Sequence, residues 1–236
     1  LGWPITRMAD EAWDWRAACA LWAALHLLLC LPLIAAVLPR RTASDAAGRT
    51  LGEPIRWDRR MIQIAAIFAG GWTVPTPMGA HVRRLPDDLG ISPAHAAWAA
   101  GLMATSAIAA RMFDLVVLHR SHPVLTVRVA CAFHPLGAGL AGLGGPWLAP
   151  LLAVGQGAGN GLLSVASGVL PLHVFGPDRY ALRQALVLTP ARYLQALAPA
   201  AWAFAIDVST AFALVASSLV CLGMCAATLG LGPRRR

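Results

Sequence analysis

Arg192 is the one charged side chain in the apolar stretch 184–206. Thr189 and Gln195 stand three residues before and after it, so the three share one side of a helix. A guanidinium in apolar surroundings is costly unless it faces water, a carboxylate or an anionic ligand, and this stretch contains no acidic residue. We therefore interpret Arg192 as a cavity residue that can bind an anion. The alternative is a structural donor to helix-end carbonyls.

A second polar group occurs in residues 61–80, within the sequence "GGWTVPTPMG". Trp72, Thr73 and Thr76 fall within ~100° of one another around a helix, and the prolines here interrupt the backbone hydrogen-bond ladder. Helices often bend in this way around a substrate. An equally good interpretation is a simple kink in which the threonines bond back to their own backbone.

Residues 155–168, "GQGAGNGLLSVASG", have the glycine spacing of a phosphate-binding loop. Such a loop needs a preceding strand, a following helix and usually a lysine, whereas these glycines lie inside an apolar stretch and the chain contains no lysine. On a helix the polar residues would fall within ~80° of one another, between two rows of glycines. The polar residues are Gln156, Asn160, Ser164 and Ser167; the rows are Gly155 with Gly159, and Gly157 with Gly161 and Gly168.

Rows of small residues let helix backbones approach closely, and polar groups surrounded by hydrocarbon must face protein or water. The polar stripe is therefore predicted to face a cavity or a partner helix. Its alternative role is to supply hydrogen bonds between helices, with no ligand.

The composition indicates which elements must position these residues. Of the chain, 58% is hydrophobic and only 13% is charged. Seven stretches of about 20 or more mainly apolar residues are each long enough to cross a ~30 Å hydrocarbon layer. They are 17–38, 61–80, 93–118, 124–143, 147–175, 184–206 and 211–231. A signal peptide would be a single short apolar run, so we predict an all-α, polytopic membrane helix bundle with seven transmembrane helices.

Arginine placement predicts the orientation, because all 19 basic residues are arginine. Most of them lie in or beside the segments 39–60, 119–123 and 176–183 and in the C-terminal "GPRRR", which fall on one side of the membrane. The positive-inside rule then places the N-terminus outside and the C-terminus inside. The net charge of +8 reflects this topology, and nucleic-acid binding is not expected.

Titratable groups inside the apolar stretches are few. The five cysteines show no CxxC spacing and are expected to be buried thiols, and we expect no metal and no cofactor. His26, His134 and His173 each stand alone on an apolar stretch, a position more typical of structural donors than of proton carriers. No Asp or Glu lies deep in any stretch, so a group that titrates during proton coupling would be a histidine or lie outside this chain.

The order of these segments resembles a known family. One helix within "WDWRAACALWAALHLLLCLPLIAAVLPR", a basic loop and six more helices look like the second half of a major facilitator superfamily transporter, from its sixth to its twelfth helix. Residues 110–120, "ARMFDLVVLHR", are similar to a degenerate copy of the family's cytoplasmic Gly-x-x-x-Asp-Arg loop motif, with Ala110 at the glycine position. Residues 157–176, "GAGNGLLSVASGVLPLHVFG", resemble the tenth helix of many bacterial members.

This resemblance implies a division of the chain into three parts. Residues 1–38 would be the last helix of the N-terminal half, 39–60 the central cytoplasmic loop, and 61–236 the C-terminal six-helix half. Five further helices would precede Leu1, and substrate would bind between the two halves near the bilayer midplane.

The resemblance also implies a function. We expect a fragment of a secondary active transporter that moves a small solute across the bacterial cytoplasmic (inner) membrane by alternating access, driven by an ion gradient, and not an enzyme. Its partners would be membrane lipid, the small-molecule substrate, the missing N-terminal half and, as a candidate coupling ion, protons. Ion pairs and helix-terminus contacts between neighbouring helices, made by a gating loop motif, would hold one conformation closed. The candidate substrate-binding residues are Trp72, Thr73, Thr76, Gln156, Asn160, Ser164, Arg192 and Gln195, and the gating residues are Arg111, Asp114 and Arg120.

The same residues bear on two other classes of membrane protein. A seven-helix membrane receptor or sensor has the same topology and is the alternative, although its retinal form is excluded because a Schiff base requires a lysine. An intramembrane serine protease with Ser167 as nucleophile is disfavoured, because the histidine downstream, His173, lies on the same predicted helix.

Overall fold

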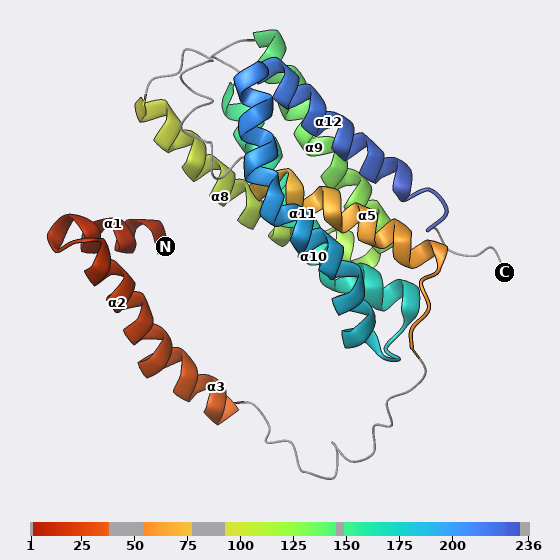
Figure 1. The fold of residues 1–236 in the computed structure, drawn as a ribbon, viewed down its shortest axis with the longest axis horizontal. Coiled ribbons are helices and arrows are strands. Elements are labelled where there is room, and N and C mark those ends of the chain that lie inside the picture. The colour runs from red at the N-terminus through yellow and green to blue at the C-terminus, as the bar shows by residue number, and fades with distance from the viewer. Residues whose placement is uncertain (1, 38–53, 77–92, 145–148, 232–236) are drawn as a thin grey trace. The chain divides into compact units, whose positions relative to one another are not determined.

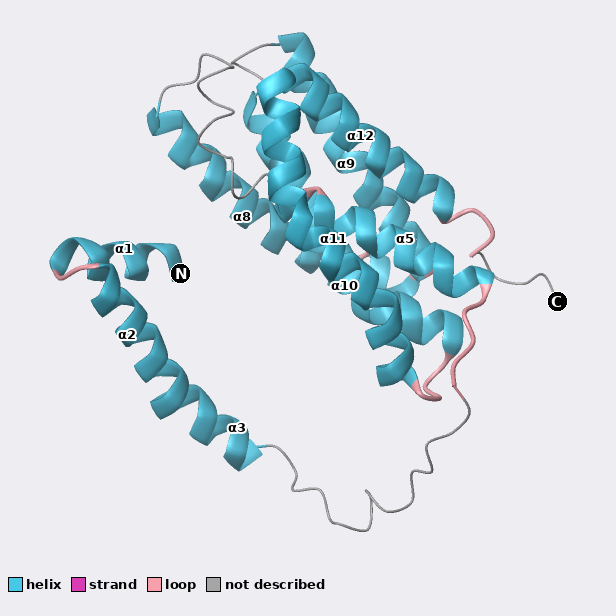
Figure 2. Cartoon of the chain, in the orientation of Figure 1, coloured by secondary structure: helices cyan, strands magenta, loops and turns pink. Residues whose placement is uncertain are grey.

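A computed structural model of the protein describes residues 2–37, 54–76, 93–144 and 149–231, and every secondary-structure element in these ranges is a helix (Figures 1 and 2). The predicted all-α class is therefore confirmed for this part of the chain. The chain divides into two compact units, residues 1–54 and 55–236. The boundary falls inside the predicted loop 39–60, most of which lies outside the described residues, as do the predicted outer segment 81–91 and the arginines of the C-terminal tail.

The first unit contains one long apolar helix with an irregular turn in its middle. Helix α1 (Gly2–Ala12) is followed by α2 (Trp15–Leu25), the π-helical turn η1 (His26–Cys30) and α3 (Leu31–Val37). Asp14 caps α2 by accepting a hydrogen bond from the Ala17 amide at 2.8 Å. The amide of Leu31 donates to the carbonyl of His26, and the π turn comes directly before Pro32, which has no N–H to continue an α-helical ladder.

The second unit contains six long helices among its described residues. They are α5 (Arg59–Thr73), α8 (Pro93–Val116), α9 (Pro123–Gly144), α10 (Ala149–Phe175), α11 (Tyr180–Val208) and α12 (Thr210–Ala227), with a short 3-10 turn, η2 (Leu118–Arg120), before α9. Asp58 caps α5 by accepting from the Met61 amide, and Ser209 ends α11 and caps α12 by accepting from the Phe212 amide at 3.0 Å. The turn between α10 and α11 has left-handed backbone at Gly176 and Arg179.

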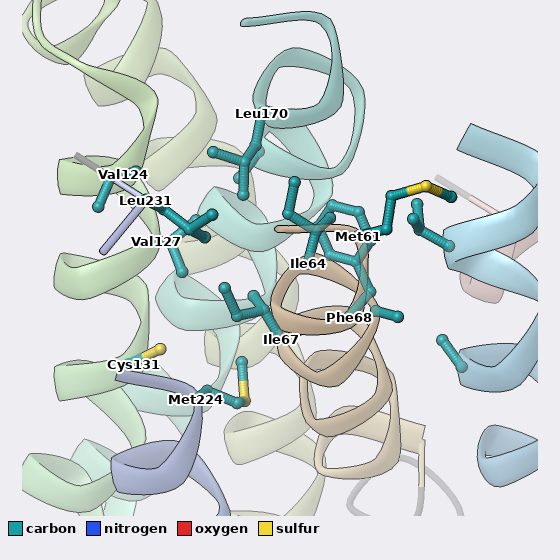
Figure 3. Close-up of a cluster of buried hydrophobic side chains, with 14 residues drawn as sticks. Met61, Ile64, Ile67, Phe68, Val124, Val127, Cys131, Leu170, Met224 and Leu231 are labelled. Carbon is teal, nitrogen blue, oxygen red and sulfur yellow. The ribbon is translucent and has the colours of Figure 1, made fainter. Parts of the chain in front are cut away.

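The six helices form two neighbouring groups (Figure 1). Helix α10 packs along both α8 and α9, while α11 packs along α5. Helix α12 contacts α9, α5 and α11, and so joins the groups. Figure 3 shows the largest apolar cluster at this junction, where Phe68 and its neighbours on α5 meet side chains of α9, α10 and α12. The labelled members are Met61, Ile64, Ile67, Phe68, Val124, Val127, Cys131, Leu170, Met224 and Leu231.

Four helices in the described residues are long and apolar enough to cross a membrane, and they coincide with four of the seven predicted stretches. They run over Trp15–Val37, Pro123–Leu143, Pro150–Phe175 and Thr210–Ala227. Helices α5, α8 and α11 overlap the other three predicted stretches, but the count of seven spans remains a prediction. Large apolar side chains are also exposed on the outer helix surfaces, for example Leu143 and Phe204, as is typical of membrane proteins.

Candidate functional site

The glycines of α10 lie at its contacts with two neighbouring helices. A Cβ atom on Gly155 would collide with the carbonyl oxygen of Phe133 on α9, and one on Gly159 would lie 3.0 Å from the carbonyl oxygen of Ala130 on the same helix. The predicted groove along Gly155 and Gly159 is therefore confirmed, and α9 fills it. The close approach of the two backbones leaves no room for a Cβ at Gly155 and little room for one at Gly159.

The second glycine row faces α8. A Cβ on Gly157 would collide with the Met103 carbonyl, and one on Gly161 would collide with the Ala107 carbonyl. This groove is confirmed for the two glycines. Gly168 is an exception, because its carbonyl accepts a hydrogen bond at 2.8 Å from the hydroxyl of Tyr180, at the start of α11.

The polar stripe of α10 bonds both to a neighbouring helix and within α10 itself. Ser164 accepts a hydrogen bond from Nε of Arg111 on α8 at 3.0 Å and donates to the carbonyl of Gly161. Ser167 donates to the carbonyl of Ser164. Gln156 is buried, at 3% exposure, and Asn160 is half-buried. Interhelical hydrogen bonding, the alternative raised for this stripe, thus accounts for Ser164.

Four predicted site residues meet at the contact between α5 and α11. The guanidinium carbon of Arg192 lies 4.7 Å from the centre of the Trp72 ring, and Nη1 of Arg192 donates to Oε1 of Gln195 at 2.8 Å. Nε2 of Gln195 in turn donates to Oγ1 of Thr76 at 3.0 Å, and that hydroxyl donates to the carbonyl of Trp72. We call Trp72, Thr76, Arg192 and Gln195 the Arg192 cluster.

The threonines of this region bear on both interpretations of the sequence, a substrate site and a simple kink. Thr73 and Thr76 both donate to backbone carbonyls of α5, those of Gly70 and Trp72, as the kink interpretation predicts. Thr76 still accepts from Gln195, so it serves both roles. Thr189 donates to the Ala185 carbonyl at 2.8 Å. Although Thr189 is predicted to lie on the same side of the helix as Arg192, its hydroxyl is bonded to its own helix and not to the Arg192 cluster.

A groove of about 380 Å³ lies between α5, α11 and α12, and two of its lining residues, Thr73 and Leu194, directly adjoin Trp72 and Gln195 in the sequence. Thr73 contributes its polar wall, and its other lining residues are apolar or glycine. They are Ala66, Ala69, Gly70, Leu194, Val220, Gly223, Met224 and Ala227. This volume is in the range of small-ligand sites, which combine apolar walls with a few polar groups.

The charge of Arg192 is not neutralised by a carboxylate in the described part of the chain. Its side chain is exposed, and its contacts there are the Trp72 ring and the Gln195 amide. A guanidinium has five N–H donors, so donors remain for an anionic or carbonyl-bearing group that approaches from outside. The Trp72 ring holds the guanidinium plane in place through a cation–π contact.

Two of the three predicted gating residues, Arg111 and Asp114, form hydrogen bonds to neutral groups. Asp114 is buried and accepts from the Thr126 hydroxyl of α9 at 2.9 Å, while Arg111 donates to Ser164. Arg120 is exposed in η2. No ion pair joins Asp114 to Arg111 or Arg120 in the described residues. The expected ion pairs are therefore replaced by bonds from Asp114 to α9 and from Arg111 to α10.

Further contacts near these helix ends were not expected from the sequence. Nε of Arg128 donates to Thr228 at 2.9 Å, and Nε2 of Gln63 donates to the Leu229 carbonyl at 2.9 Å, so the end of α12 is joined to α9 and α5. The rings of His122 and His173 meet edge to face with centres 4.4 Å apart. Burial lowers the pKa of His122 below 6.5, and nearby His173 and Arg128 lower it further.

A buried polar group in the core was also missed. Nε2 of His134 on α9 lies 2.7 Å from Oγ of Ser217 on α12, and both residues are 3% exposed. Gln156 of α10 lies beside the same ring. His134 is thus a bonded residue, as expected for a structural histidine. Ser217 was not singled out, because a serine within an apolar helix usually bonds to its own backbone, which Ser217 also does.

No protein-family model, curated protein or solved structure matches this sequence. The resemblance to the major facilitator superfamily therefore stays a prediction. The function has to be argued from the Arg192 cluster, the groove beside it and the apolar helices that carry them.

Proposed function

We propose that this chain is the C-terminal part of a secondary active transporter of the bacterial inner membrane, which moves a small solute by alternating access. The observation that carries the proposal is the Arg192 cluster. Residues that the sequence puts on two separate helices, about 120 residues apart, join in one connected hydrogen-bond and cation–π network. Polar groups within membrane helices are costly, and they commonly mark a solute route.

The surroundings of the cluster support a solute site over a purely structural contact. Arg192 keeps unused donors and has no carboxylate partner in the described residues. The groove between α5, α11 and α12 is mostly apolar, and two of its lining residues directly adjoin Trp72 and Gln195 in the sequence. A site of this kind can bind a small molecule through its apolar part and orient its polar group on the guanidinium.

The packing of the second unit supports movement of helices as groups. Glycine contacts hold α8, α9 and α10 at short backbone distances, so these helices can move as one rigid body. Alternating access proceeds largely by rocking of such bodies around a central site. In this proposal the seven predicted spans place the N-terminus outside and the C-terminus inside, and the missing N-terminal half completes the solute pathway.

The experiment is solute flux by the full-length protein reconstituted in proteoliposomes. We would impose an ion gradient and screen radiolabelled carboxylates, amino acids and sugars. We expect uptake above that of empty liposomes for one class, and at least a tenfold reduction in the Arg192→Ala variant. The Arg56→Ala variant is the matched control, because Arg56 is also exposed but lies in the segment before α5, away from the cluster.

Two results would contradict the proposal. Absence of gradient-driven flux for every solute tested, with the protein correctly inserted, would argue against transport. Saturable solute binding without flux would instead favour the seven-helix receptor or sensor.

A further inference from the structure

The buried pair of His134 and Ser217 allows the position of one proton to be assigned. The Ser217 hydroxyl has a single hydrogen, which it can donate to the Leu214 carbonyl, 3.0 Å away. When that hydrogen is donated to the carbonyl, the serine oxygen accepts from the histidine ring, and on this basis we assign a hydrogen to Nε2 of His134. The neutral ring then has its lone pair on Nδ1.

Nδ1 of His134 is buried and has no hydrogen-bond partner. Gln156, itself 3% exposed, lies beside this ring. Its amide oxygen is an acceptor that a hydrogen on Nδ1 could use.

Few other titratable or charged groups face this position. Helices α9, α10 and α12 carry a single charged side chain between them, Arg128, whose Nε donates to Thr228 about two turns away from His134. The remaining titratable groups of these helices and of η2 are thiols close to the pair and groups at the helix ends. They are Cys131 on α9, Cys221 and Cys225 on α12, His173 on α10, and His119 and Arg120 in η2. No carboxylate occurs on these four elements.

We propose that Nδ1 of His134 is a proton-binding site in the core of the second unit, with Gln156 as the acceptor of the new N–H. A proton from the aqueous phase binds the lone pair of Nδ1, and the ring becomes an imidazolium. Nε2–H continues to donate to Ser217, and Nδ1–H donates to the Gln156 amide oxygen. No other bond is made or broken.

The burial of the pair links this proton to conformation. Because His134 is 3% exposed, a proton reaches Nδ1 when α9 separates from α12 or α10. Protonation and helix movement then favour each other, which is the requirement for coupling a proton to transport. This last step rests on the proposed transporter function, whereas the proton site itself does not.

The proton site can be tested without measuring transport. We would label histidine with ¹⁵N in the full-length protein in lipid nanodiscs, and record the imidazole nitrogen signals between about pH 8 and pH 4. The signal absent from the His134→Gln variant belongs to His134. We expect the Nε2–H tautomer at neutral pH, reversible protonation of Nδ1 at acidic pH, and protonation at a lower pH in the Gln156→Leu variant.

The control is His26→Gln, because His26 lies in the first unit, is exposed and contacts the Trp22 carbonyl. Its removal should leave the His134 signal unchanged. A His134 ring with its hydrogen on Nδ1, or a ring that never titrates while the protein stays folded, would overturn the proposal. If His134→Gln does not fold, the same titration in Ser217→Ala and Gln156→Leu decides the question, because each must shift the protonation pH.

A second measurement tests the coupling. In proteoliposomes, the ratio of proton-gradient-driven uptake to solute counterflow should fall at least tenfold in His134→Gln relative to wild type. An unchanged ratio would show that His134 does not take part in coupling protons to transport. If wild type shows no flux at all, the transporter proposal fails, and the nitrogen titration still decides the proton site.

Discussion

The packing of α10 against α8 and α9 differs from the packing of α5 against α11. The contacts of α10 are made by glycines, with backbone against backbone and little or no room for a Cβ atom. The contact of α5 with α11 includes long polar side chains, and a groove of about 380 Å³ adjoins it. Small residues let two helices pack closely, whereas the Arg192 cluster leaves hydrogen-bond donors of the guanidinium unused and has a groove beside it. The comparison is consistent with our proposal, in which the first region supplies rigidity and the second contains the solute site.

The largest effect on stability is expected from adding a methyl group at the contact between α10 and α8. A Cβ on Gly161 would meet only backbone atoms of Ala107, which cannot rotate away. Gly161→Ala should lower the free energy of unfolding by about 1–3 kcal/mol, as overpacking does. Thermal and denaturant unfolding in detergent would measure the change.

The control for this variant is Gly139→Ala on α9. A Cβ on Gly139 has no atom within 4 Å, so this variant should be neutral or stabilise by up to about 1 kcal/mol through helix propensity. Equal effects of the two substitutions would contradict the assignment of the glycines to helix contacts.

Asp114 tests whether the gating residues control the opening of the bundle. Asp114→Asn keeps an oxygen that can accept from Thr126 but removes the charge, so the unfolding free energy should change by less than about 1 kcal/mol. We nevertheless expect a changed inward/outward balance, measured by the accessibility of single cysteines to membrane-impermeant reagents. Labelling identical to wild type at every position would count against a gating role.

A smaller effect on stability is expected at the contact between α5 and α11. The Arg192 guanidinium is exposed, so its interaction with Trp72 should contribute about 0.5–1 kcal/mol to stability. A double-mutant cycle of Trp72→Ala and Arg192→Ala would measure this coupling energy. A coupling larger than the cost of Gly161→Ala would reverse the comparison, since the Arg192 cluster would then be the main structural contact.

The smallest effect is expected from His122, at the end of the region rich in glycine contacts. The pKa of His122 in the folded protein is lower than its ordinary value of 6.5. At a pH between these two pKa values, the unfolded chain binds more protons than the folded protein. Stability should be fully present above pH 6.5 and decrease as the pH falls below it. Unfolding measured from about pH 7.5 to pH 5 should show this loss in wild type.

His122→Asn is the matching variant, because its side-chain oxygen can still accept from the Val124 amide that bonds Nδ1 of His122. The pH dependence should be weaker in this variant. A steeper decrease in the variant than in wild type would contradict the lowered pKa.

The sequence alone determined the features that depend on one helix at a time. Apolar length predicted the positions of the helices, and the spacing of 3.6 residues per turn put Gly155 and Gly159 on one face and Gly157 and Gly161 on another. The structure confirms both faces. Helical periodicity also indicated that Trp72 and Thr76 lie on one side of their predicted helix, and that Arg192 and Gln195 lie on one side of α11.

Only the tertiary structure decided which faces meet. Lipid-facing and helix-facing surfaces are both apolar, so nothing in a single helix specifies its neighbour. The chain of bonds from Arg192 to Thr76, the bond from Arg111 to Ser164 and the pairing of His134 with Ser217 join residues 53 to 119 positions apart. A one-helix pattern fixes the direction of a side chain, but its partner depends on how all the helices pack together.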